Sequence, residues 1–232
     1  MRNFLFSVFF YIGIIFICLI FLPSLILPHR FTLIGGKLMG FWAKYCLIFF
    51  MSTKIVVKGE ENILKNEKFF IACSHQSMFE TFFLQTIFHS PIFILKKELL
   101  NIPVFGWYLK KIKSISIDRD KISKKNLDFY EKIKTSYKNS NRPIIIFPQA
   151  TRLMPEDRSD FKKGASRIYE MLKLKCQPVA INSGTVWPKS GPLLANKILT
   201  ISILEPINPN LNSKDFLKLL QKNIYKELDN LN

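Results

Sequence analysis

At 232 residues, the chain has the length of one ordinary domain with an appended element, and its 48% hydrophobic content, including 22 phenylalanines, suffices for a large core. Its 34 lysines and arginines against 17 acidic residues give a net charge of +17, which favours polyanionic partners: nucleic acid, an anionic membrane surface or phosphorylated substrates. The four cysteines form no Cys-x-x-Cys pair, and His29 and His89 add no ligand set, which argues against a metal site and indicates a reducing compartment.

The first segment of the chain is an apolar stretch that carries no charge from Asn3 to Pro28. About 20 apolar residues suffice to cross the hydrocarbon core of a bilayer, so this stretch is long enough. A signal peptide is the alternative, but its apolar part usually has about 7–15 residues and ends in small residues before a cleavage site. Here the run is longer and ends in Leu-Pro-His-Arg. We therefore favour a membrane anchor that stays on the protein.

The next segment, residues 31–50, has apolar residues at helical spacing and two lysines, Lys37 and Lys44, on one face. Tryptophan, tyrosine and lysine together are typical of the headgroup zone of a membrane, so we predict an amphipathic helix at the interface. A second spanning helix or a core helix is the alternative. Pro23 and Pro28 permit a turn, so the two segments can also form a helical hairpin that dips into one leaflet. A membrane surface accounts for much of the basic charge and weakens the case for nucleic acid.

From Lys54 onward, short strand patterns alternate with helical patterns. That alternation predicts an α/β fold with a largely parallel sheet flanked by helices, preceded by an N-terminal hydrophobic membrane helix or two-helix membrane motif. We divide the chain into a membrane-anchoring helical segment, residues 1–52, and an α/β domain, residues 53–232. Ser213 is the expected N-cap of the last helix. Strands are expected at 54–59, 68–74, 91–97, 113–119, 142–148, 177–184 and 197–207, and helices at 78–88, 124–139, 164–175 and 213–230.

Polar residues follow three of these strands at their carboxyl ends, where ligands gather in folds of this kind. His75 and Glu80 follow the second strand, Asp118 and Arg119 follow the fourth, and residues 149–152 follow the fifth. One such cluster can arise by chance. Three clusters that are rich in catalytic or anion-binding residue types predict a functional site.

Together these clusters resemble the glycerolipid acyltransferase family, in particular the lysophosphatidate acyltransferases (1-acyl-sn-glycerol-3-phosphate acyltransferases). Of the family's four blocks, His-x4-Asp/Glu corresponds to HQSMFE, and a lysine-rich strand end with Pro-x-x-Gly and a later Asp-Arg corresponds to LKKELLNIPVFGW and ISIDR. Phe-Pro-Glu-Gly-Thr-Arg corresponds to FPQATR, and an apolar strand with an early proline to QPVAINSG. The resemblance covers roughly residues 54–190. Gln149 and Ala150 depart from the third block, where Glu and Gly are commonest, which bears on substrate preference more than on the reaction.

The resemblance implies a role for each residue of the first block. His75 would accept the proton of a substrate hydroxyl as that hydroxyl attacks a thioester, because imidazole titrates near neutral pH. Glu80 would orient the ring and stabilise the imidazolium, and no serine nucleophile is needed. The structural alternative is a surface histidine beside a helix-capping acid.

The acceptor's phosphate requires cations, and the resemblance assigns that contact to the arginine of the third block and to basic residues of the second. Arg152 has the planar fork that binds phosphate oxygens in pairs. For Arg119, an ion pair with Asp118 or Asp120 is the alternative, and for Thr151 a structural role is. The expected substrate-binding residues are Arg152, Lys97, Lys96, Arg119, Gln149 and Thr151.

The expected reaction moves a fatty acyl group from acyl carrier protein (acyl-ACP) or coenzyme A (acyl-CoA) to the sn-2 hydroxyl of lysophosphatidate. The product is phosphatidate for phospholipid biosynthesis, and no metal or cofactor is expected beyond the thioester co-substrate. Expected partners are this lipid, the donor and an anionic membrane surface, with no nucleic acid. The expected place is a membrane, the bacterial inner membrane, with the active site on the cytoplasmic side.

Two other functions remain open at this stage. An acyltransferase for glycerol-3-phosphate or another lysolipid would share the same blocks. A non-catalytic basic module that binds membrane or nucleic acid is a function of another class. That module would leave the His-x4-Glu block without a role, and replacing His75 would not affect it.

Overall fold

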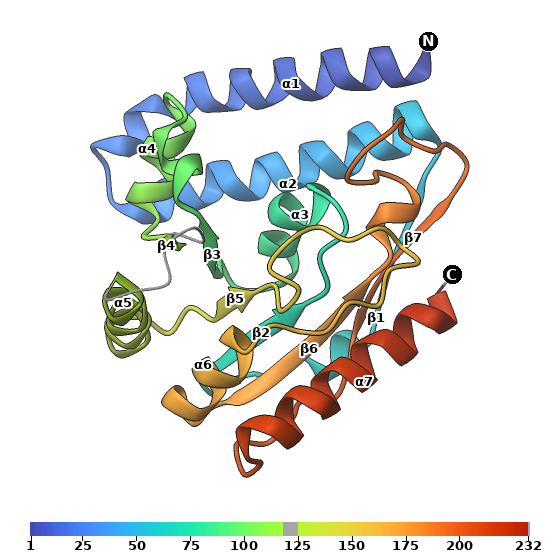
Figure 1. The fold of residues 1–232 in the computed structure, drawn as a ribbon. Helices are drawn as coiled ribbons and strands as arrows, with labels where there is room; N and C mark the ends of the chain where they lie inside the picture. Colours follow the sequence, from blue (N-terminus) through green and yellow to red (C-terminus); the bar gives the residue numbers. More distant parts are fainter. Residues whose placement is uncertain (118–124, 232) are drawn as a thin grey trace.

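The computed structural model describes residues 1–117 and 125–231, with the backbone alone for 125–128. Its seven strands form one sheet in the order β1-β7-β6-β2-β5-β3-β4 (Figure 1). Among the described strands, β6 and β7 are the antiparallel pair and the other neighbours are parallel. This confirms the α/β fold with a largely parallel sheet. The strands are β1 Lys54–Lys58, β2 Phe69–Cys73, β3 Ile92–Lys96, β4 Ile115–Ile117, β5 Ile144–Ile146, β6 Lys175–Ile181 and β7 Ile198–Ile203.

Helices cover both faces of the sheet (Figure 1). The inner sides of α1, α2 and α3 share one hydrophobic cluster with the sheet, and α5, α6 and α7 share the other. The α-helices are α1 Arg2–Ile20, α2 His29–Met51, α3 Phe79–Ile87, α4 Phe105–Lys111, α5 Lys125–Asn139, α6 Gly164–Leu172 and α7 Ser213–Leu231. Short 3₁₀ helices are η1 Leu22–Leu25, η2 Glu60–Asn62, η3 Lys97–Asn101 and η4 Ser183–Thr185.

Strand β2 shows why its sequence is apolar at every position. Successive side chains of a strand point to opposite faces, and a parallel sheet has helices on both. Phe70 and Ala72 accordingly lie in the cluster under α5–α7, whereas Ile71 and Cys73 lie in the cluster under α1–α3. Strand β2 is therefore buried on both faces, and the polar residues that follow it in the chain begin where this buried strand ends.

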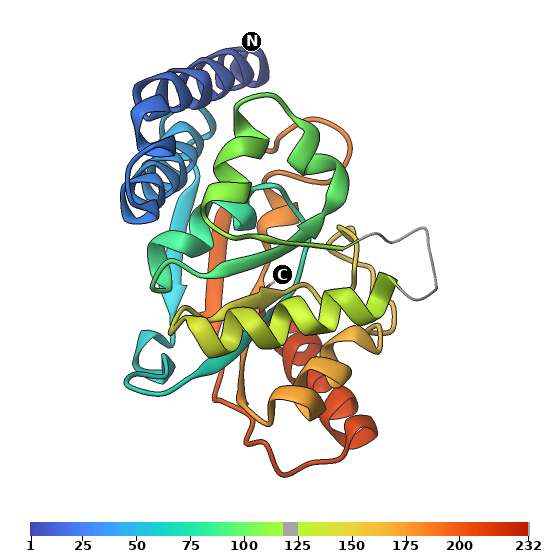
Figure 2. The ribbon, with the colours of Figure 1, turned by 90° about the vertical axis from the view of Figure 1, so that its left-hand side faces the viewer.

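The two N-terminal helices lie side by side as a hairpin on one side of the sheet (Figure 2). Both are long and apolar enough to cross a membrane, judged by length and composition. The inner face of α1 also contributes to the core, because Phe6 and Phe10 are buried and each packs edge-on against Trp187 with ring centroids 5.0 Å apart. The division of the chain into two domains at residue 52 stays a prediction. Helices α1 and α2, which precede that residue, share a hydrophobic cluster with the sheet.

Helix α2 approaches α3 closely at its glycines. A Cβ atom at Gly40 would lie 2.5 Å from the carbonyl oxygen of Phe82, and one at Gly36 would lie 2.5 Å from the side-chain oxygen of Gln85. Glycine is therefore required for the two backbones to approach this closely. Because α3 begins just after the candidate histidine, this contact links the hairpin to the site.

Several boundaries differ from the sequence-based prediction. Helix α6 ends at Leu172, because Lys173 takes a left-handed conformation with φ 49°, and β6 already begins at Lys175. The N-cap of α7 is Asn212 and not Ser213, because the Asn212 side-chain oxygen accepts the backbone N–H of Asp215 at 2.9 Å. Helices η3 and α4, between β3 and β4, were not predicted.

Candidate active site

The turn between β2 and α3 brings His75 and Glu80 together. His75 Nδ1 lies 3.6 Å from Glu80 Oε1, which is within ion-pair range and slightly beyond a hydrogen bond. Among the described residues, neither His75 Nδ1 nor Glu80 Oε2 has a hydrogen-bond partner, although both atoms are buried. Catalytic hydrogen bonds are often long in the free enzyme and shorten when substrate binds. The arrangement suits a base and its orienting acid.

Glu80 is fully buried and also fixes the turn that carries the histidine. Its Oε1 accepts the backbone N–H groups of Gln76 at 2.7 Å and Ser77 at 2.8 Å. Its place in the first turn of α3 also suits a negative charge, because the helix dipole is positive there. The same carboxylate therefore closes the turn and faces the imidazole, so the helix-capping and catalytic interpretations of this residue are compatible.

The backbone and ring of His75 are held from the loop that follows β5. Its N–H donates to Gln149 Oε1 at 2.7 Å, and its carbonyl oxygen accepts the N–H of Leu153 at 2.9 Å. The ring stacks on Phe147 with centroids 4.1 Å apart and 20° between the planes. The side chain is 14% exposed. Because Nδ1 faces Glu80, Nε2 is the nitrogen available to a substrate hydroxyl.

Gln149 holds the backbone at the site. It is 3% exposed, and its oxygen serves the His75 N–H. Its side chain also lies near the hydroxyl of Tyr225, which donates a hydrogen bond to the carbonyl oxygen of Ser159. Burial raises the pKa of that hydroxyl, so it stays protonated at neutral pH. The structure thus gives Gln149 a positioning role, and its expected contact with a substrate hydroxyl stays a prediction.

Lys96, Lys97, Thr151 and Arg152 lie at the same carboxyl edge of the sheet, because they follow or end β3 and β5, which are neighbours. Lys96 ends β3 and its Nζ lies 3.4 Å from Glu98 Oε1 in an exposed pair. Lys97 and Thr151 are exposed, and Arg152 is half-buried. Among the residues whose side chains are described, 1–117 and 129–231, Lys97 and Arg152 form no ion pair. Arg119, with Asp118 and Asp120, lies outside the described residues.

Ala150 occupies a backbone conformation that favours glycine. Its φ is +60°, and its N–H closes the turn by donating to the carbonyl oxygen of Phe147 at 2.9 Å. A non-glycine residue in this left-handed region is strained. The structure therefore explains why glycine is commonest here in the resembling family, and it identifies Ala150 as a source of local strain.

A cavity of about 220 Å³ lies beside Phe147, at the ends of β3 and β5. Lys162 and Arg167 line it together with Pro148 and Ala150. Sequence reasoning did not select these two cations or Phe147. The basic run FKKGASR was the available signal, but it follows the third block by several residues. Both cations are further candidates for the anion-binding edge.

Comparisons with known proteins identify the family of the chain. A model of the family described as Acyltransferase matches residues 54–182. The 1-acyl-sn-glycerol-3-phosphate acyltransferase of Helicobacter pylori is 37% identical over 161 residues, which cover 68% of this chain and 67% of that protein. The protein of the same name from Pseudomonas aeruginosa is 36% identical over 137 residues, which cover 58% of this chain and 52% of that protein. The chain thus spans about half to two thirds of these relatives.

A solved structure supports the fold over the whole length. The crystal structure of the 1-acyl-sn-glycerophosphate (LPA) acyltransferase PlsC from Thermotoga maritima superposes with a TM-score of 0.79. The match covers 99% of this chain and 97% of that chain, at 22% sequence identity. At that identity, the similarity shows that the fold is shared.

Proposed function

Because this chain belongs to the acyltransferase family, we propose that it is a 1-acylglycerol-3-phosphate O-acyltransferase. It transfers a fatty acyl group from a thioester to the sn-2 hydroxyl of lysophosphatidate and makes phosphatidate. The observation that carries this proposal is the buried Glu80 beside His75 at the carboxyl edge of the sheet. The names of the relatives from H. pylori and P. aeruginosa support the choice of acceptor.

The geometry gives each residue of the pair a step in the reaction. His75 Nε2 accepts the proton of the sn-2 hydroxyl while the hydroxyl oxygen bonds to the carbonyl carbon of the thioester. The carbon–sulfur bond then breaks, and the leaving thiolate takes the proton from the imidazolium. Glu80 holds Nδ1 and stabilises the positive ring in between, as the acid of a catalytic triad does. No metal and no cofactor beyond the thioester takes part in this proposal.

The phosphate of the acceptor binds at the edge formed by the ends of β3 and β5. Arg152 supplies the guanidinium fork, and Lys96 and Lys97 supply further positive charge. The exposed pair between Lys96 and Glu98 opposes this little, because an exposed ion pair is worth about 0–1 kcal/mol. The acceptor's own charge thus fixes its headgroup near His75.

The hairpin of α1 and α2 provides the membrane contact in this proposal. The inner side of α2 packs on α3 and β1, so α2 cannot cross a bilayer alone without drawing the α/β domain into it. The hairpin therefore dips into one leaflet, which we place in the cytoplasmic face of a bacterial inner membrane. Its outward side is apolar along both helices, with these exposed residues: Phe4, Phe9, Ile12, Ile15, Phe16, Leu19, Ile34, Leu38, Phe41, Tyr45 and Phe49.

An acyl-transfer assay tests the function directly. The purified protein in detergent is given palmitoyl-ACP or palmitoyl-CoA, each with lysophosphatidate, glycerol-3-phosphate or lysophosphatidylcholine. The proposal predicts phosphatidate as the main product, with lysophosphatidate preferred to the other acceptors. Faster acylation of either other acceptor, or no transfer to lysophosphatidate from either donor, would overturn it.

A further inference from the structure

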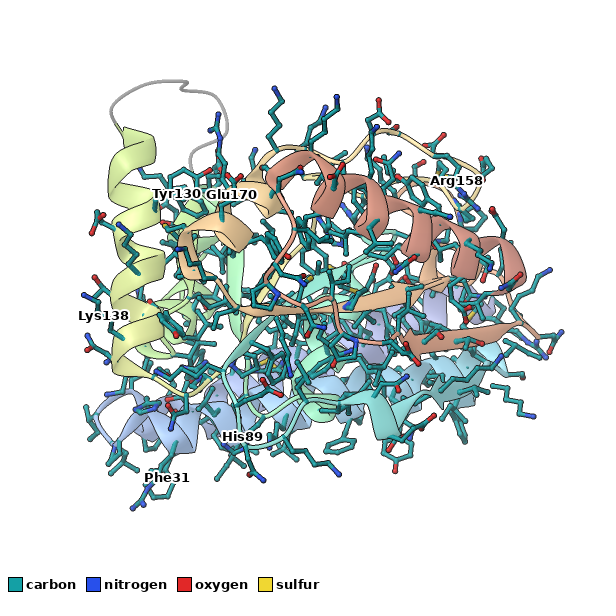
Figure 3. The ribbon with its side chains drawn as sticks, turned by 90° about the horizontal axis from the view of Figure 1, so that it is seen from below. Phe31, His89, Tyr130, Lys138, Arg158 and Glu170 are labelled. Atoms are coloured by element: carbon teal, nitrogen blue, oxygen red, sulfur yellow. The ribbon has the colours of Figure 1, made fainter. Side chains whose placement is uncertain are left out.

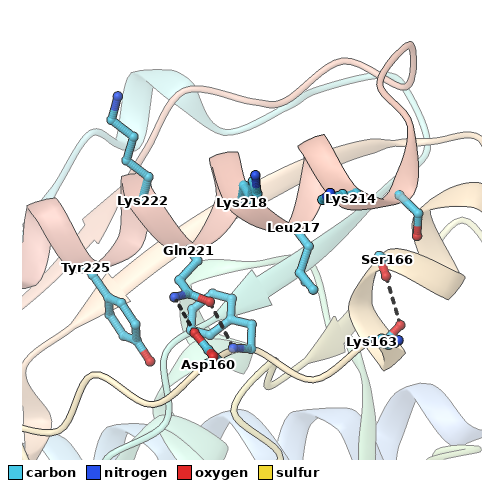
Figure 4. Close-up of a pocket in the computed structure, with 11 residues that line it drawn as sticks. Asp160, Lys163, Ser166, Lys214, Leu217, Lys218, Gln221, Lys222 and Tyr225 are labelled. Carbon is cyan, nitrogen blue, oxygen red and sulfur yellow. Dashed lines mark hydrogen bonds between the residues drawn. The ribbon is translucent and has the colours of Figure 1, made fainter.

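The carboxyl-terminal helix borders a groove that the reaction above does not use. This groove has a volume of about 860 Å³ and lies between α7 and the segment that leads into α6. Lys214, Lys218 and Lys222 follow one another at intervals of four residues along α7, and we call them the lysine row. Figure 4 shows the row on the outer side of α7, whereas Leu217 and Tyr225 point toward the segment below.

The groove combines positive charge with an apolar floor. Lys163 adds a fourth cation, and Phe161 and Leu217 supply apolar surface. The acidic residue in its lining, Asp160, already accepts a hydrogen bond from Gln221 Nε2 at 3.1 Å. Neither the lysine row nor Lys163 forms an ion pair with any side chain that the structure describes, which excludes residues 118–128. Positive charge that the protein leaves uncompensated attracts an acidic ligand.

The shape of this charge favours a protein over a nucleotide. An α-helix rises 1.5 Å per residue, so the row extends over about 12 Å, and Lys226 continues it to about 18 Å. The phosphates of one nucleotide gather in a shorter span. A line of carboxylates along a helix of a partner protein matches a straight row of this length.

The position of α7 favours a ligand that arrives through water. Helix α7 lies on the opposite side of the sheet from α1 and α2 (Figures 2 and 3). When the apolar hairpin lies in a membrane, the lysine row therefore points away from the lipid. An anionic lipid headgroup is thus a poor match for the row.

The groove also adjoins the loop that holds the catalytic histidine. Tyr225 lines the groove and its hydroxyl donates to the carbonyl oxygen of Ser159, in the loop whose Gln149 accepts the His75 N–H. Further along α7, Asp229 pairs with Arg158 of the same loop at 2.6 Å. A ligand held on α7 therefore binds next to the loop that holds the backbone of His75.

We propose that the lysine row and its groove dock an acidic, water-soluble carrier protein that brings the acyl thioester to His75. This inference rests on the proposed function, since it names the donor of that reaction. Carboxylates of the carrier pair with the row, and the apolar floor receives side chains at the edge of the contact. The lipid acceptor enters from the hairpin side, so the two substrates do not compete for one entrance.

Charge reversal on α7 tests the docking surface. The variant carries Lys214→Glu, Lys218→Glu and Lys222→Glu, and a control with the same change in net charge carries Lys58→Glu, Lys65→Glu and Lys197→Glu at exposed sites elsewhere. Initial rates of lysophosphatidate acylation are measured with palmitoyl-ACP and with palmitoyl-CoA. Thermal melts exclude misfolding, and a milder pair, Lys218→Gln with Lys222→Gln, replaces the triple variant if it unfolds.

The expected result is a rise of about tenfold or more in the KM for palmitoyl-ACP, with kcat at saturation little changed. The control should leave that KM within about twofold, and the row variant should use palmitoyl-CoA as the wild type does. An unchanged KM for palmitoyl-ACP, an equal rise in the control, or a rise for palmitoyl-CoA alone would overturn the inference. If the wild type acylates lysophosphatidate from palmitoyl-CoA only, the docking inference fails and the proposed function stands.

Discussion

The two faces of the sheet are covered by helices whose outer sides differ in character. Helices α1 and α7 both bury apolar residues in the clusters that cover the sheet, so their inner sides are alike. On its outer side α1 exposes residues such as Ile12 and Phe16, whereas α7 exposes Lys218 and Lys222. Soluble monomers rarely expose a continuous apolar surface of this length. The buried residues thus do not distinguish the two sides of the molecule. The exposed residues do: apolar ones on α1 suit lipid, and lysines on α7 suit water.

The candidate site lies where these two faces meet. His75 and Glu80 come from the turn into α3, which packs under α2. Phe147 and Gln149 come from the loop that hydrogen bonds and an ion pair with α7 hold in place. A lipid acceptor and a donor from water can therefore reach one histidine from different sides. The changes below test parts of this contrast separately.

The largest effect is expected where the faces meet. Glu80→Gln keeps an oxygen that can accept the N–H groups of Gln76 and Ser77, but it removes the charge beside the imidazole. Turnover should fall by about 10²–10⁴, as for loss of an orienting carboxylate, with thermal stability close to the wild type. The control is Glu98→Gln at an exposed acid. Wild-type turnover in Glu80→Gln would show that this carboxylate is only a structural cap.

The apolar outer side of α1 can be disrupted by substitutions, without deleting the helix. This matters because the inner side of α1 contributes to the core. The variant Ile12→Glu with Phe16→Glu places two charges on its outer side, where these residues are 60% and 62% exposed. A charge within the hydrocarbon costs about 2.5–3.5 kcal/mol, so binding to phosphatidylcholine vesicles should fall by about 50-fold or more. Lys226→Glu on α7 makes the same change in net charge and should leave this binding intact. Full flotation of the double variant would contradict a membrane role for α1.

The contact between α2 and α3 joins the hairpin to the site. Gly40→Leu forces a side chain against the backbone of Phe82, and overpacking of this kind costs about 1–3 kcal/mol of unfolding free energy. Gly164→Ala is the control, because a Cβ atom there meets its nearest neighbour at 3.9 Å, and it should cause no loss. Chemical unfolding measures both. Equal stability of Gly40→Leu and the wild type would mean that α2 does not pack closely on α3.

The smallest effect concerns the loop held by α7. Ala150→Gly relieves the left-handed strain of about 1–2 kcal/mol but loses part of the gain to the greater freedom of glycine in the unfolded chain. A net gain of up to about 1 kcal/mol is therefore expected. Ala165→Gly, in α6, should have the opposite sign, because glycine destabilises a helix. Destabilisation by Ala150→Gly would contradict the backbone conformation described for this loop.

Local pattern predicted much of the fold and the pair of residues at its site. The run FFIAC is too short for an ordinary helix and stands in an alternating α/β pattern, so it predicts a buried strand, and the spacing from His75 to Glu80 placed both at one strand end. The helix α4 was missed because its seven residues follow a proline-containing turn and are too few to show a period. The positioning role of Gln149 depends on its hydrogen bond with His75, which is 74 residues away in the chain. No local pattern encodes a contact of that range.

The most direct test of the account is the turnover of His75→Ala beside His89→Ala, which changes an exposed histidine. Both proteins are assayed with lysophosphatidate in mixed micelles at saturating acyl donor. The account predicts a loss of about 10²–10⁴ in kcat for His75→Ala, with the KM for lysophosphatidate and the thermal midpoint little changed. His89→Ala should behave as the wild type. Turnover of a folded His75→Ala protein within about threefold of the wild type would contradict general-base catalysis by this residue.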